Sequence, residues 1–201
     1  MGTPKVAKPS SFPPNPAQWQ AERNGLAFRR RFRVAVDAPL QPFEIGKHFP
    51  GVTLLSKDEL EELVASEDRA EAFGPARFLW SAVTVPIPGV GNVIILNHSH
   101  APTRQNATLT EEFFHIFLQH KPTKIKPCPQ TGLMRREFDR SMEQEAYWSA
   151  AAALVPYGAL RNMVDEGLSI SDIAIHFEVS LDLVEFRLKV TKLWRKVLVE
   201  S

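Results

Sequence analysis

Hydrophobic and polar positions along the chain predict a mixture of short strands and helices. Two apolar runs containing β-branched residues, at 79–85 and 92–97, flank a segment with two prolines and two glycines, which is typical of an antiparallel hairpin. A third apolar run at 52–55 predicts another short strand. Helical periodicity dominates the remainder, so the pattern predicts an α+β fold in which a small antiparallel sheet packs on helices.

Eight segments carry helical periodicity or helix start and stop signals. These predicted helices cover residues 17–36, 42–49, 57–65, 108–120, 135–154, 157–166, 171–177 and 181–198. Ser56 and Glu59 have the spacing of a capping box at the start of the third helix, and Thr108 is the expected N-cap of the fourth. The proline-containing segments 98–107 and 121–132 are expected to be loops.

The composition narrows the class of protein. Hydrophobic residues make up 44% of the 201 positions and include 13 Phe and 4 Trp, enough to fill a packed core. The net charge of +1 gives no bulk attraction to nucleic acid or to an acidic partner. The single cysteine, Cys128, excludes an internal disulfide and fits a reducing compartment. The sequence has no apolar run of ~18 residues and no apolar signal region near its start, so we expect a cytoplasmic protein without a membrane span.

The predicted helix 108–120 carries the most informative chemistry. In zinc peptidases two histidines one helical turn apart bind the metal, and a glutamate beside the first activates water. Here Glu111 and His115 stand four residues apart, and Glu112 follows the first of them. The chain therefore offers a carboxylate and an imidazole where the pattern has two imidazoles. The competing interpretation is that both carboxylates are solvated at the start of a helix and that His115 is simply a buried histidine.

A third ligand would have to come from another helix. Glu145 lies at the head of an alanine-rich helix, thirty residues beyond His115, and Glu143 is a second acidic candidate. Two carboxylates and one imidazole can bind zinc, manganese or iron. Three further histidines lie nearby in the sequence and could replace a ligand: His98, His100 and His120.

Several short motifs occur in a fixed order around these residues. A strand is expected to end at Asn97, Arg104 lies in the following segment, and Thr108-Leu109 come shortly before Glu111. The later motifs are Glu145-Ala146, Leu154-Val155-Pro156, Phe177-Glu178-Val179-Ser180 and Arg187-Leu188. In this order and spacing the chain resembles the ImmA/IrrE family of bacterial metallopeptidase-like proteins, over about residues 20–195.

The resemblance implies a metal centre and assigns its residues. In that family two histidines and a later glutamate bind zinc, and the glutamate of the first motif activates water. Carried over position by position, His115 and Glu145 are metal ligands and Glu112 is the catalytic base. Glu111 holds the first ligand position, and Phe114 stands where the family usually has glycine. The implied cofactor is Zn²⁺, with Mn²⁺ or no metal as alternatives.

The resemblance also implies a biological role. We expect a cytoplasmic regulator that binds and cleaves a protein, often a helix-turn-helix repressor or an antitoxin, in bacterial stress or mobile-element control. Two alternatives stay open: an inactive pseudopeptidase that only binds its partner, and a DNA-binding regulator. The expected division is a flexible tail at 1–16 with five prolines, a metallopeptidase-like domain at 17–160 and a helix-turn-helix-like extension at 161–201.

The DNA-binding alternative depends on the C-terminal helices and on the basic cluster Arg29–Arg33. Segment 171–188 has helix-turn-helix-like spacing, but Asp182 and Glu185 would face phosphates near the start of its second helix. The basic residues that follow, such as Arg187, only partly offset them. Direct binding of nucleic acid is therefore not expected, and the basic cluster is expected to be a solvated helix face.

Overall fold

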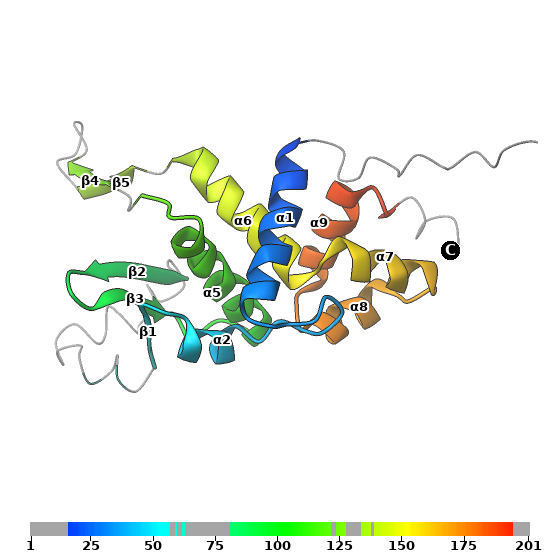
Figure 1. The fold of residues 1–201 in the computed structure, drawn as a ribbon, viewed down its shortest axis with the longest axis horizontal. Helices are drawn as coiled ribbons and strands as arrows, with labels where there is room; N and C mark the ends of the chain where they lie inside the picture. Colours follow the sequence, from blue (N-terminus) through cyan, green and yellow to red (C-terminus); the bar gives the residue numbers. More distant parts are fainter. Residues whose placement is uncertain are drawn as a thin grey trace, which may run out of the picture.

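The computed structural model describes residues 16–56, 59, 62, 81–121 and 139–194, together with the backbone of 124–127 and 134–137. In this part of the chain the helices are α1 (Pro16–Arg31), α2 (Pro42–His48), α5 (Pro102–Phe117), α6 (Arg140–Leu154), α7 (Tyr157–Asp165), α8 (Ile170–Phe177) and α9 (Leu181–Thr191). The strands are β1 (Val52–Leu55), β2 (Ala82–Ile87), β3 (Gly91–Leu96), β4 (Lys124–Pro127) and β5 (Met134–Glu137). Figure 1 shows the three-stranded sheet towards one end, α7 to α9 towards the other, and α1, α5 and α6 between them. The α+β class is therefore confirmed.

The three-stranded sheet has the order β1-β3-β2. β2 and β3 pair antiparallel, from Ala82 opposite Leu96 to Ile87 opposite Gly91, which confirms the predicted hairpin. β1 instead pairs parallel to β3, so the sheet is mixed and the prediction of a purely antiparallel sheet is wrong. Tight turns join only antiparallel strands, whereas the long connection from β1 to the hairpin permits a parallel pairing.

The turn of this hairpin is tighter than predicted. β2 continues through Pro86 to Ile87, and β3 already begins at Gly91. Pro86 is tolerated because β2 lies at the edge of the described sheet, where proline's missing N–H costs least. Gly91 has a φ of +119°, and a Cβ there would lie 2.5 Å from the carbonyl oxygen of Gly51, so the close approach of β3 to the residue before β1 requires glycine.

The core forms where α1 and α5 pack on α6. The alanines of α6 are buried and let α1 approach closely, because a Cβ added to Gly25 would lie only 2.7 Å from the backbone nitrogen of Ala153. Phenylalanines from α1, α5 and the end of α2 fill the remaining space, and the ring centroids of Phe28 and Phe114 are 4.8 Å apart. The members of this aromatic cluster are Phe28, Phe32, Phe49, Phe113, Phe114 and Phe117. This packing fixes α5 relative to α6 and so positions the side chains described below.

α5 starts earlier than the sequence analysis predicts. Its N-cap is Ala101 and its first residue is Pro102, so Thr108 lies inside the helix and is not a cap. Proline is favoured at the first helical position, because the N–H it lacks would be unpaired there and its φ suits a helix. The predicted loop 98–107 is therefore helical from Pro102 onward.

A second hairpin lies where the sequence analysis predicts a loop and the start of a helix. β4 and β5 pair antiparallel, and α6 begins at Arg140 and not at residue 135. The start of α6 is set by Asp139, whose carboxylate accepts a hydrogen bond from the N–H of Ser141 at 2.9 Å. An N-cap of this kind satisfies a free helix donor and ends the preceding extended segment.

The C-terminal helices agree with the predicted ones to within a residue or so at their starts. α8 begins with a capping box between Ser169 and Asp172, and Ser180 is the N-cap of α9. Arg187 of α9 is 1% exposed, and its Nη2 donates to Glu22 Oε2 of α1 at 2.6 Å. This buried ion pair anchors the helix-turn-helix-like unit to α1, and leaving either charge unpaired would be costly.

Other predictions concern segments that the structure describes only in part. The capping box at Ser56 and Glu59 is confirmed, since the Ser56 N–H donates to Glu59 Oε2 at 2.8 Å and the Glu59 N–H to Ser56 Oγ at 3.2 Å. Most of the predicted helix 57–65 lies outside the described residues, as do residues 1–15 and Cys128. The boundary between the expected metallopeptidase-like domain, 17–160, and the expected helix-turn-helix-like extension, 161–201, stays a prediction. Among the described residues, no helix has the length and apolar character needed to cross a bilayer.

Candidate metal centre

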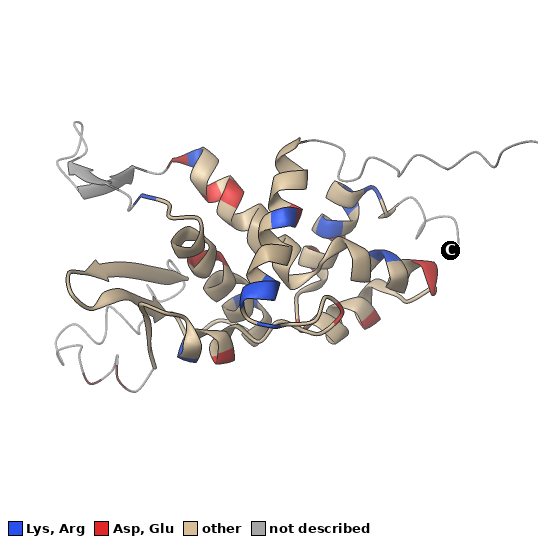
Figure 2. Cartoon of the chain, viewed as in Figure 1, with Lys and Arg blue, Asp and Glu red and all other residues tan. Residues whose placement is uncertain are grey.

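Three side chains from α5 and α6 form a group that can hold a metal. Glu111 and His115 lie one turn apart on the same side of α5, and the first turn of α6 brings Glu143 against them. One ligand atom from each of the three lies within 4.8 Å of the other two. Figure 2 shows acidic positions on both α5 and α6. The pair from the first motif is therefore joined by an acid of the second helix, in the order that the sequence motifs indicate.

The electrostatics of this group are those of crowded, partly desolvated carboxylates. Burial, together with the nearby charges of Glu112 and Glu143, raises the pKa of Glu111 from 4.5 to about 7. Burial also lowers the pKa of His115, against the opposing effect of Glu143 and Glu112. A lowered pKa favours the neutral form of His115, so its ring does little to offset the charge of the carboxylates. A divalent cation would relieve the repulsion among them.

The distances suit a metal ion. Ligand atoms on a tetrahedral zinc ion with bonds of ~2.0–2.1 Å stand roughly 3.3 Å apart. The ligand atoms of Glu111, His115 and Glu143 are within 4.8 Å of one another, so small side-chain rotations bring them to that spacing. Carboxylate oxygens and an imidazole nitrogen suit zinc and also manganese. The residues present therefore fit the metal that the sequence analysis expects.

Glu112 lies next to the group and is held by the sheet. Thr84 Oγ1 on β2 donates a hydrogen bond to Glu112 Oε2 at 2.5 Å. A carboxylate fixed through one oxygen keeps the other oxygen free for proton transfer. The predicted base position is thus filled by a glutamate whose orientation comes from a different element of the fold. Sequence reasoning missed Thr84, because only the packing of β2 on α5 brings it there.

The structure favours Glu143 over Glu145 as the third member of the group. Glu145, preferred from the family spacing, is not in the group, and its Oε2 instead lies 3.3 Å from His120 Nε2. His120 in turn places its Nδ1 3.1 Å from His115 Nδ1. The sequence gives only one signal for this contact, the position of His120 five residues after His115, just past the end of α5.

The remaining sequence candidates lie elsewhere. Phe114 is fully buried and contacts Phe28 and Phe117, so its ring fills the core between α1 and α5. His98 and His100 precede α5, and neither joins a ligand group in the described part of the chain. The substitution of glycine by Phe114 therefore changes the packing of the helices rather than the composition of the metal group.

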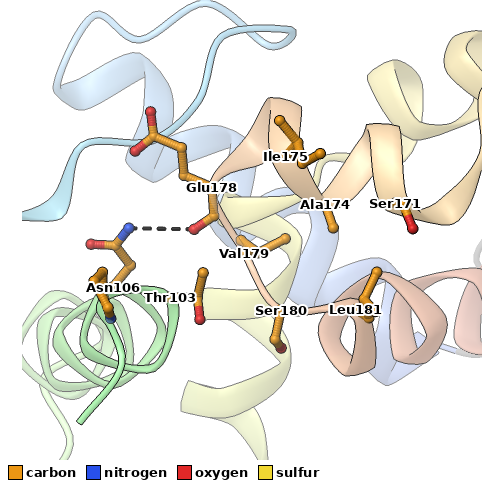
Figure 3. Close-up of a pocket in the computed structure, with 10 residues that line it drawn as sticks. Thr103, Asn106, Ser171, Ala174, Ile175, Glu178, Val179, Ser180 and Leu181 are labelled. Carbon is orange, nitrogen blue, oxygen red and sulfur yellow. Dashed lines mark hydrogen bonds between the residues drawn. The ribbon is translucent and has the colours of Figure 1, made fainter.

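A groove of about 600 Å³ lies apart from this group, where the start of α5 meets the turn between α8 and α9. Asn106 of α5 is joined to that turn by a hydrogen bond (Figure 3). Its Nδ2 donates to the carbonyl oxygen of Glu178 at 3.4 Å. Ile175 and Leu181 line it and are 76% and 49% exposed. None of the metal-group residues lines this groove, so it is a second surface feature of the domain.

The side chains on α5, the acidic start of α6 and the adjoining sheet together define a metallopeptidase-like domain. The chain matches the family model Peptidase_M78, the IrrE N-terminal-like domain, over residues 63–189, and it belongs to that family. The matched range contains every member of the metal group, together with Thr84, Glu112 and His120. Comparisons with curated proteins and with solved structures gave no match.

Proposed function

We propose that this chain is a metal-dependent endopeptidase that cuts a regulatory protein, a helix-turn-helix repressor or an antitoxin, in bacterial stress or mobile-element control. The observation that carries the proposal is the grouping of Glu111, His115 and Glu143 next to a base, Glu112, that Thr84 orients. These are the parts that hydrolysis of a peptide bond with a metal requires. The family membership supports the same reaction class.

The side chains of the group have separate roles in the proposed reaction. The three ligands would hold a Zn²⁺ or Mn²⁺ ion, whose chemistry is to polarise a peptide carbonyl and activate water. Glu112 takes up the proton of the attacking water and passes it to the leaving amine. Because Thr84 occupies Oε2 of this carboxylate, Oε1 is the oxygen that moves the proton.

The ligand charges predict slow turnover. Two carboxylates and a neutral imidazole leave a Zn²⁺ site with no net charge, whereas two histidines and one glutamate leave +1. A metal held in a less positive site would activate water less strongly.

The exposed groove supports a protein partner. Ile175 and Leu181 both line the groove and are 76% and 49% exposed, and apolar side chains exposed together on one surface are a feature of protein contact sites. The DNA-binding alternative has less support. The basic cluster is a solvated face only in part: Arg30, Arg31 and Arg33 are exposed as expected, but Arg29 is 1% exposed and donates to the carbonyl oxygens of Ala35 and Ala153. Arg187 is buried against Glu22, so neither it nor Arg29 reaches a phosphate.

Substitution of the base tests the proposal. Wild type and Glu112→Gln are purified without chelator, their metal content is measured, and each is incubated with repressors and antitoxins encoded near its gene. We expect equal metal content, cleavage of one partner by wild type, and a loss of ~10²–10⁴-fold in rate for the variant. Glu166→Gln, at an exposed glutamate that caps the end of α7, is the matched control. Metal-free wild type, or binding of one partner by both proteins without cleavage, would favour the pseudopeptidase instead.

A further inference from the structure

Two residues next to the proposed metal centre have no role in it so far, His120 and Glu145. The His120 side chain is only 7% exposed, although it follows the end of α5. Its backbone N–H donates to the carbonyl oxygen of His115 at 2.9 Å, and Gln119 before it adopts a left-handed φ of 56°. The backbone therefore turns back after α5 and holds His120 under His115, so their contact is built into the fold.

The contacts form one continuous chain of four groups. Glu143 Oε2 lies 3.7 Å from His115 Nε2. On the other side of that ring, His115 Nδ1 lies 3.1 Å from His120 Nδ1. His120 Nε2 lies 3.3 Å from Glu145 Oε2. In each imidazole, one nitrogen faces the neighbour on the side of the metal group, and the other nitrogen faces the next residue of the chain of contacts.

With both rings neutral, one arrangement of protons satisfies both contacts of His120, to Glu145 and to His115. A carboxylate only accepts hydrogen bonds, so His120 Nε2 must donate to Glu145. The Nδ1 of His120 is then an acceptor, and His115 Nδ1 must donate to it. His115 therefore carries its proton on Nδ1, and the lone pair of Nε2 faces Glu143 and the rest of the metal group.

We propose that Glu145 and His120 form an outer relay that fixes His115 in the tautomer whose Nε2 binds the metal. This inference rests on the proposed metal centre and names two positioning residues for it. Histidines that bind metals generally donate their second N–H to a carboxylate or carbonyl, which orients the ring and increases its basicity. Here a second imidazole stands between the ligand and the carboxylate. The relay strengthens the one imidazole ligand left to a site in which glutamate replaces the other.

A rival arrangement would make His120 itself a ligand, with both Nδ1 atoms on one metal ion. The geometry disfavours it, since His120 is not in the group formed by Glu111, His115 and Glu143. A metal between the two Nδ1 atoms would put the proton of His115 on Nε2, facing the Glu143 carboxylate, which is the opposite tautomer. The two arrangements differ in how many imidazoles bind the metal, and that number can be measured.

The test reads the tautomer of His115 directly. The full chain is labelled with ¹⁵N-histidine, freed of metal with a chelator, and studied by long-range ¹H–¹⁵N spectroscopy at pH 8, well above the ordinary histidine pKa of about 6.5. We expect the Nδ1–H form of His115 in wild type. His120→Leu and Glu145→Ala should turn it into a mixture, whereas His120→Asn, which keeps an acceptor oxygen near the place of Nδ1, should preserve it. His48→Leu, an exposed histidine at the end of α2, is the control.

Zinc titration gives the second readout. Loss of the relay in His120→Leu should weaken zinc binding by ~10–100-fold, with substantial rescue in His120→Asn. X-ray absorption on the zinc form should count one imidazole. A count of two, an Nε2–H form of His115 in wild type, or an unchanged tautomer in both relay variants would overturn the proposal. If His120→Leu fails to fold, Glu145→Ala still decides, because that side chain is 44% exposed. Wild type that binds no zinc would overturn the proposed metal centre, whereas the tautomer of the metal-free protein tests the relay separately.

Discussion

Replacing Glu111 by glutamine should stabilise the metal-free protein at pH 8. Burial, followed by the charges of Glu112 and Glu143, raises the pKa of Glu111 from 4.5 to about 7, so the ionised carboxylate is disfavoured in the folded state. At 1.36 kcal/mol per pKa unit, that shift corresponds to about 3 kcal/mol of lost stability once the group is ionised. Since the side chain retains some contact with solvent, we expect a gain of roughly 1–3 kcal/mol for Glu111→Gln.

The pH dependence has a definite sign. A carboxyl group with a raised pKa in the folded state contributes stability below pH 4.5, and that stability is lost as the pH rises to about 7. Glutamine stays neutral throughout. The stability difference between Glu111→Gln and wild type should therefore be near zero at pH 4 and reach its full size at pH 8. Urea unfolding with a chelator present, at both pH values, measures this difference.

Metal should reverse the order of stability. Zinc at a thousand times its Kd would stabilise wild type by about 4.1 kcal/mol, more than the expected gain of the variant, and it should do little for a variant that has lost one ligand. Glu166→Gln, exposed and distant, should change stability by less than about 0.5 kcal/mol at either pH. A variant less stable than wild type at pH 8, or one with an equal gain at pH 4 and pH 8, would refute the electrostatic reasoning.

Two further substitutions test the ligand position and the helix packing. Glu111→His should raise zinc affinity, because it restores an imidazole and a net charge of +1 to the site, and competition titration against a zinc chelator would show equal or weaker binding if this is wrong. Gly25→Ala should destabilise the protein by several kcal/mol, since the new Cβ would lie 2.7 Å from the backbone of Ala153. Gly158→Ala, where a Cβ meets nothing within 4 Å, should be neutral or slightly stabilising in the same urea assay.

Features set by neighbours in the sequence could be predicted. The β2–β3 hairpin, the capping box at Ser56 and Glu59, and the start of α9 after Ser180 each depend on a few adjacent residues. The pairing of β1 could not be predicted in this way. Its parallel direction depends on β3, some forty residues further along the chain, and the short run at 52–55 fits either direction equally well.

The boundaries of α5 and α6 show a different limit. Both helices begin at local signals, Pro102 and the Asp139 cap, that the sequence contains. These signals compete with equally plausible ones nearby, such as Thr108 in front of two glutamates. Helix propensity alone cannot decide which of these residues begins the helix. The helix begins where its apolar face can pack against the core, and that depends on the tertiary structure.

The third member of the metal group shows why spacing alone is insufficient. Residues two apart on a helix point in directions ~200° apart, so Glu143 and Glu145 cannot both face the same partner on α5. Spacing within a motif favoured Glu145, whereas the crossing of α5 and α6 turns Glu143 toward His115. The same crossing gives Glu145 its contact with His120. The sequence thus pointed to the helix that lies against His115, and the packing decides which of its acids faces that histidine.

The two departures from the family pattern, Glu111 and Phe114, have separate physical consequences. Phe114 is fully buried with its ring 4.8 Å from that of Phe28, so its extra volume is taken up where α1 packs near α5. Glu111 adds a negative charge to a place that already holds Glu112 and Glu143. The first departure alters shape away from the ligands, and the second alters the charge that the metal experiences. Restoring histidine at position 111 should therefore recover the site charge typical of the family, with no need to reverse Phe114.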